Sequence, residues 1–171
     1  SMLLTNNVLL VVACATVLLG TLYPLLIDAL GIGKISVGPP YFNAVFVPVM
    51  TPVLFLMGVG PFARWKEASI GEILRTLRWA FAAAGMVAIA LPFVYGAWTP
   101  LTALGLLMAA WVTLSTALNF ITRVQHTRGG QSFLAAALKQ PRNFVGMNVA
   151  HIGIAVFVVG VTMVSSFQEE K

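Results

Sequence analysis

The sequence predicts an all-α membrane protein, a polytopic bundle of about five transmembrane helices. Hydrophobic residues make up 59% of the 171 residues and charged residues only 9%, whereas a soluble domain carries roughly 25% charged residues. The mean hydropathy of +0.93 agrees with this composition. Because so few charges cannot cover a soluble globule, the composition excludes a disordered chain, a coiled coil and a conventional soluble enzyme.

Five stretches are long enough to cross a bilayer, which takes about 20 mostly apolar residues. The first carries only Asp28, at its end, and the third has Pro92 in its last turn. The fourth begins with Pro100, a residue favoured in the first turn of a helix. We expect residues 1–171 to form a single transmembrane domain, with spans at 8–30, 41–62, 79–95, 100–121 and 144–167.

Eight of the ten Lys and Arg residues fall in two loops, residues 63–78 and 122–143. Cytoplasmic loops carry an excess of these residues, so we expect both loops, and with them the N-terminus, to be cytoplasmic and the C-terminus periplasmic. Orientation in the membrane therefore explains the net charge of +5 better than a nucleic-acid partner does. Aromatic residues expected at the interfaces are Trp65 and Trp79 on the cytoplasmic side, and Tyr23, Tyr41, Tyr95 and Trp98 on the other.

The loops contain helix signals of their own. Ser69 and Glu72 have the spacing of a capping box, which predicts that the third helix begins in the cytoplasm, before its membrane span. Residues 132–140 are predicted to form a short amphipathic helix on the membrane surface, ended by Pro141. Asn143 is a candidate cap for the fifth span.

His151 is the one clear ionisable residue placed well inside a span, and such residues are functional candidates because the bilayer disfavours them. Its own helix offers no carboxylate partner, and its face carries mostly apolar residues with one amide, Asn148. Three interpretations remain open: a hydrogen bond that holds the bundle together, an axial metal ligand, or proton transfer. One imidazole cannot make a six-coordinate haem iron, so the ligand interpretation requires a second donor.

A row of mostly small residues lies on the neighbouring face of the same span. These residues are typical of a seam that lets another helix approach closely and would fix the direction of His151. The row is Gly146, Ala150, Gly153, Phe157 and Gly160.

Other distinctive residues have simpler interpretations. His126 lies in a basic loop and is predicted to be a surface histidine. Cys14 lies in an apolar run, which predicts a buried, inert thiol. Trp111 is deep in a span and is expected to pack against other helices. Residues 38–41, Gly-Pro-Pro-Tyr, predict a sharp turn into the second span, with Gly38 in an unusual backbone conformation.

The sequence contains no phosphate-binding glycine loop, no Ser/His/Asp set and no cluster of metal ligands, so we predict no catalytic residue in this chain. The single cysteine excludes a disulfide framework within it. No span carries the run of polar residues that lines a channel or carrier pathway.

Three segments of the sequence are distinctive: residues 6–24, the loop at 33–43 (Gly-Lys-Ile-Ser-Val-Gly-Pro-Pro-Tyr-Phe-Asn) and residues 146–156 (Gly-Met-Asn-Val-Ala-His-Ile-Gly-Ile-Ala-Val). In these segments the chain resembles the CcmF-type proteins of bacterial cytochrome c maturation. The resemblance implies the inner-membrane subunit of a haem lyase, which joins haem to apocytochrome c. It also implies a haem b held in the membrane between two histidines, which keeps the iron of the substrate haem reduced. His151 matches one of these two axial ligands.

The resemblance further implies the partners: the rest of the lyase chain, a haem chaperone, the proteins that deliver apocytochrome c, and membrane lipid. The tryptophan-rich periplasmic segment of the family and its periplasmic histidines are missing from this sequence. We therefore expect an internal portion of the lyase that is inactive alone. The alternatives are a haem-carrying anchor subunit of a respiratory complex and a structural bundle without a cofactor.

Overall fold

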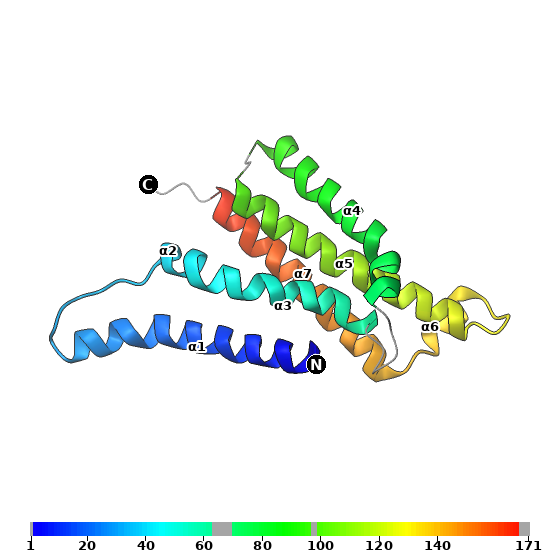
Figure 1. Cartoon of the computed structure of the whole chain (residues 1–171), viewed down its shortest axis with the longest axis horizontal. Coiled ribbons are helices and arrows are strands. Elements are labelled where there is room, and N and C mark those ends of the chain that lie inside the picture. The colour runs from blue at the N-terminus through cyan, green and yellow to red at the C-terminus, as the bar shows by residue number, and fades with distance from the viewer. Residues whose placement is uncertain (1, 63–69, 97–98, 168–171) are drawn as a thin grey trace. The chain divides into compact units, whose positions relative to one another are not determined.

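The computed structural model describes residues 2–62, 70–96 and 99–167, and this part of the chain is helical without strands. Its elements are α1 (Met2–Ala29), α2 (Pro39–Tyr41), the π-helix η1 (Phe42–Phe46), α3 (Val47–Val59), the 3₁₀ helix η2 (Gly60–Phe62), α4 (Ile70–Tyr95), α5 (Pro100–Thr127), α6 (Phe133–Leu138) and α7 (Arg142–Phe167) (Figure 1). Five helical stretches are long and apolar enough to cross a membrane. The all-α fold with about five such helices is thus confirmed.

The helices extend beyond several of the apolar stretches. α5 continues to Thr127, whereas its apolar stretch ends near residue 121. α4 begins at Ile70, well before the predicted span at 79, which agrees with a helix that starts outside the membrane. Ser69, the other half of the predicted capping box, lies outside the described residues, as do Trp65 and Trp98. Hydropathy marks the apolar part of a helix, but backbone hydrogen bonding continues into polar residues.

The chain divides into two compact units, Ser1–Leu56 and Met57–Lys171. In the first unit, Tyr41 packs against α1 at Gly20, where an added Cβ would lie 2.7 Å from Cε1 of the ring. The Tyr41 hydroxyl donates a hydrogen bond of 3.1 Å to the carbonyl oxygen of Thr16. A side chain at position 20 would clash with the Tyr41 ring, so glycine is the residue that fits there.

The entry into α2 uses its two prolines, as predicted, but not an unusual conformation of Gly38. Pro39 and Pro40 occupy the first helical positions, where their missing N–H groups need no partner. Gly38 has φ −117° and ψ −165°, an extended conformation that any residue adopts, so the predicted unusual backbone at Gly38 is wrong. A π turn follows, in which the Val47 N–H bonds to the Phe42 carbonyl just before Pro48.

In the second unit, α5 lies between α4 and α7 (Figure 1). Thr99 caps α5, because its hydroxyl accepts a 3.1 Å hydrogen bond from the Thr102 N–H. Trp111 is only 2% exposed and meets Phe81 of α4 edge to face, with ring centroids 5.5 Å apart. The indole also lies directly against Gly58. The prediction that Trp111 is a packing residue is confirmed.

Helices α5 and α7 approach each other closely near the start of α5 and the end of α7, at the end of the unit away from the basic loops. The Thr162 side chain of α7 lies against Gly105 of α5, where a Cβ would clash with it. One turn away, the hydroxyls of Thr102 and Ser166 form a 2.6 Å hydrogen bond between the two helices. A small residue and a polar pair thus hold these helices together, as is typical of membrane bundles.

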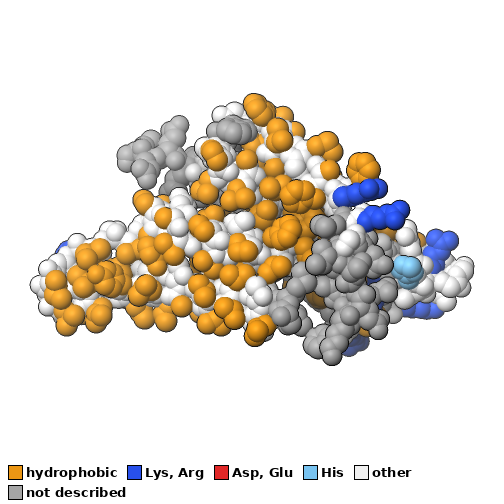
Figure 2. Space-filling model, in the orientation of Figure 1, with side chains coloured by type: hydrophobic (Ala, Val, Ile, Leu, Met, Phe, Trp, Pro, Cys, Tyr) orange, Lys and Arg blue, Asp and Glu red, His pale blue; other side chains and the backbone are white. Residues whose placement is uncertain are grey.

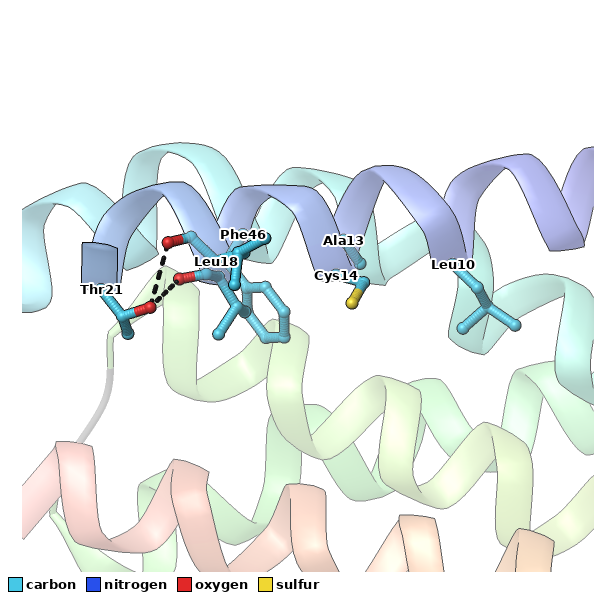
Figure 3. Close-up of a pocket in the computed structure, with 7 residues that line it drawn as sticks. Leu10, Ala13, Cys14, Leu18, Thr21 and Phe46 are labelled. Atoms are coloured by element: carbon cyan, nitrogen blue, oxygen red, sulfur yellow. Dashed lines mark hydrogen bonds between the residues drawn. The ribbon is translucent and has the colours of Figure 1, made fainter. Parts of the chain in front are cut away.

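Cys14 is exposed on α1, so the prediction of a buried thiol is wrong. Its side chain lies in a shallow apolar cleft within the first unit (Figure 3). The lining residues are Leu10, Ala13, Cys14, Val17, Leu18, Thr21 and Phe46. The reason for the error is physical: an apolar run places a residue in the membrane, but it does not distinguish a protein interior from a lipid-facing surface.

Candidate functional site

His151 lies on α7, about two and a half turns after the helix begins at Arg142. Its ring nitrogen Nδ1 lies 2.8 Å from the carbonyl oxygen of Met147, one turn earlier in the same helix. A carbonyl oxygen only accepts hydrogen bonds, so Nδ1 carries the proton and donates it. In the neutral ring, Nε2 then holds the free lone pair, and it has no hydrogen-bond partner among the described residues.

This hydrogen bond begins and ends on α7. In the described part of the chain, His151 therefore does not join α7 to another helix, as the bundle-holding interpretation would require. His151 is half-buried, and so are Met147, Ile154 and Val158 on the same face of the helix. The half-buried neighbours of His151 on its own face of α7 are thus apolar.

A buried polar residue lies one turn before His151 on α7. Asn148 is 7% exposed, and its side-chain nitrogen Nδ2 donates a 2.7 Å hydrogen bond to the Phe144 carbonyl. Its oxygen Oδ1 is buried without a partner among the described residues, as is the hydroxyl of Thr116 on α5. The sequence pattern contains the amide of Asn148 on this helix but does not encode its burial.

The predicted seam of small residues lies on the outer face of α7. Gly146, Gly153 and Gly160 are exposed, and an added Cβ at each would meet nothing within 4 Å. The expectation that this seam brings a neighbouring helix close is therefore wrong for the described residues. The spacing of small residues shows where a helix can approach, but not which helix does so.

Basic side chains gather at one end of the second unit (Figure 2). The Arg123 guanidinium lies 4.5 Å from the ring centroid of Phe144, which stacks on Phe120 with a centroid distance of 5.9 Å. His126 is exposed in the last turn of α5 at this same end, so its prediction as a surface histidine is confirmed.

The start of α7 differs slightly from the predicted one. The helix begins at Arg142, and the Pro141 carbonyl accepts hydrogen bonds from the N–H groups of Phe144 and Val145. Asn143 thus lies inside the first turn rather than before it, although its side-chain oxygen still accepts a 2.9 Å hydrogen bond from the Phe144 N–H. Among the residues that the structure describes, no group of three or more His, Cys, Asp or Glu is placed to hold a metal ion.

The fold and the site define a class: polytopic α-helical membrane proteins with a histidine inside a membrane-spanning helix. Over its whole length the chain is 39% identical to the cytochrome c-type biogenesis protein CcmF of Pseudomonas aeruginosa and 37% identical to CcmF of Escherichia coli K12. It is 34% identical to the cytochrome c-type biogenesis protein CycK of Rhizobium meliloti over 98% of the chain. The chain belongs to this CcmF-type family of cytochrome c-type biogenesis proteins.

The chain spans about 25% of the length of each of these relatives. No family model matches the sequence. No solved structure matches it either.

Proposed function

We propose that this chain forms a membrane part of a cytochrome c haem lyase, and that His151 is one axial ligand of an intramembrane haem b. The relatives support the general role, because each is named as a cytochrome c-type biogenesis protein. The observation that carries the proposal is the hydrogen bond from His151 Nδ1 to the Met147 carbonyl. Histidines that bind metals commonly donate their second nitrogen in this way, which fixes the tautomer and the ring orientation.

The residues present fit a haem ligand in their chemistry. Imidazole nitrogen is a common axial donor to haem iron, and Nε2 of His151 is the nitrogen left free for it. The half-buried apolar residues on the same face suit a large, flat, hydrophobic ligand. The second axial ligand would come from a part of the lyase outside this chain.

When bound, haem would supply one-electron exchange, which could keep the iron of the substrate haem reduced. The chain's own residues would bind and position the group. The Met147 carbonyl would hold the imidazole in one tautomer, and the apolar face of α7 would exclude water and lower the local dielectric. In this proposal no residue of the chain acts as a catalytic residue in the attachment of haem to apocytochrome c.

We also propose that residues 1–171 form one transmembrane domain of the bacterial inner membrane. The loops at 63–78 and 122–143 and the N-terminus would be cytoplasmic, and the C-terminus periplasmic. The supporting observation is that five arginines lie near the same end of the packed helices α4, α5 and α7. They are Arg75, Arg78, Arg123, Arg128 and Arg142. The partners would be the rest of the lyase chain, a haem chaperone and the proteins that deliver apocytochrome c.

The test replaces His151 by alanine in the full-length protein. We expect loss or weakening of the low-spin haem spectrum of the purified protein and a lower yield of cytochrome c. His126→Ala is the matched control, since this exposed histidine lies outside the apolar region and should change neither reading. His151→Gly with added imidazole should regain part of the spectrum. A full and unshifted haem spectrum in His151→Ala would end the ligand proposal.

A further inference from the structure

The short helix α6 displays apolar side chains that the rest of the second unit does not cover. Leu134 is 69% exposed and Leu138 is 80% exposed, and they lie one turn apart on the same face. Phe133 beside them is 41% exposed, whereas Ala136 is 4% exposed where α6 packs on α5. The helix is therefore amphipathic, with one face against the bundle and an apolar face directed outward.

Hydrogen bonds hold α6 against the ends of its neighbouring helices. Ser132 caps its N-terminus by accepting a 3.3 Å hydrogen bond from the Ala135 N–H. The Gln140 side-chain amide donates a 2.8 Å hydrogen bond to the Thr127 hydroxyl at the end of α5. Lys139 Nζ donates to Gln131 Oε1 at 2.9 Å, which closes the loop. α5 ends at Thr127 and α7 begins at Arg142, so α6 lies between the ends of two helices that are long and apolar enough to cross a membrane.

The charged residues within the segment that contains α6, residues 122–143, are all positive. Arg128, Lys139 and Arg142 flank the helix and are exposed. The sequence has no Asp or Glu between Glu72 and Glu169, so this segment contains no carboxylate to neutralise them. Exposed leucines beside cations that have no carboxylate in their own segment match the surface of an anionic bilayer, where apolar acyl chains lie beneath negatively charged headgroups.

We propose that α6, with Arg128, Lys139 and Arg142, is a binding site for anionic phospholipids. The three cations contact the headgroup phosphates, and Leu134 and Leu138 enter the upper part of the acyl layer. An acidic protein would satisfy the cations but would leave the two leucines without an apolar partner. This proposal does not depend on the haem ligand, because it concerns only the loop between α5 and α7.

The test uses the full-length protein in nanodiscs of phosphatidylcholine alone or mixed with phosphatidylglycerol. The measurement is the rate of amide hydrogen exchange in residues 128–141. We expect several-fold slower exchange with phosphatidylglycerol, and loss of that difference at high salt, which screens exposed charges. Each cation near an anionic surface is expected to contribute about a fivefold factor to lipid affinity.

Two variants separate the contributions. Arg128→Gln, Lys139→Gln and Arg142→Gln together should remove the dependence on phosphatidylglycerol, and Leu134→Ser with Leu138→Ser should speed exchange in both lipids. Lys34→Gln, which removes the cation of the other described loop, is the control and should behave as the parent. Unchanged exchange at residues 103–120 shows that a variant is folded. Equal exchange of the parent protein in the two lipids would overturn the proposal, whatever the variants do.

Discussion

The contact between Gly105 and Thr162 allows a sharp test of how α5 and α7 pack. An alanine Cβ at Gly105 would overlap the Thr162 hydroxyl and would lie 2.9 Å from its Cγ2 and 3.1 Å from its Cβ. Rotation of the Thr162 side chain moves the first two atoms but not the third, because Cβ is fixed by the backbone. Gly105→Ala must therefore separate the two helices by a few tenths of an ångström or strain Thr162.

The expected size follows from two opposing effects. Overpacking of a close interface typically costs about 1–3 kcal/mol, while replacing a helical glycine by alanine contributes about 0.5–1 kcal/mol of stability. The midpoints of these two ranges give a net loss of about 1 kcal/mol. In a unit of this size, that corresponds to a fall of about 2–8 °C in the midpoint of thermal unfolding.

The assay is the thermal midpoint of the detergent-solubilised protein, followed by the loss of its monodisperse peak in size-exclusion chromatography. Gly85→Ala is the matched control, because a Cβ there meets nothing within 4 Å, and it should leave the midpoint equal or higher. Thr162→Ala removes the two closest atoms but keeps Cβ, so it should rescue part of the loss in the double variant. A Gly105→Ala protein as stable as the parent, or no rescue by Thr162→Ala, would refute the described packing of these two helices.

Two further predictions concern the loops. In intact cells, and with Cys14 replaced, a cysteine at Gln131 should resist a membrane-impermeant thiol reagent while one at Ser36 should react; the opposite pattern would reverse the orientation of the chain. Replacing Pro39 and Pro40 together by alanine in the full-length protein should lower the cytochrome c yield with haem b retained, if this loop packs under the periplasmic domain that presents the haem. A normal yield at equal expression would leave these prolines only the role of starting α2.

The class of fold could be predicted from the sequence because a bilayer imposes a strong and local requirement. Twenty apolar residues must form a helix there, since no water is present to satisfy the backbone. The same requirement hides what each helix faces. Cys14 and Ala13 are neighbours in one apolar run, yet Ala13 is buried and Cys14 is exposed.

The candidate site could be predicted only in part, for a similar reason. His151 stands out because ionisable residues are rare inside spans, and that signal needs no knowledge of its neighbours. Its hydrogen bond to Met147 depends on the rotamer of the ring, and the burial of Asn148 depends on how α7 turns toward α5. The π turn before Pro48 is another feature of three-dimensional fit that a hydropathy pattern does not encode.

The group that holds the His151 ring is a backbone carbonyl and not a side chain, so the same hydrogen bond does not require a particular residue type at the partner position. Any residue at position 147 presents the same carbonyl, so side-chain substitution there leaves the ring's tautomer unchanged. Helical geometry places this carbonyl four residues back along the chain, and the rotamer of the ring brings Nδ1 to it. A histidine in another apolar helix can form the same bond when its ring takes this rotamer, without a supporting partner side chain.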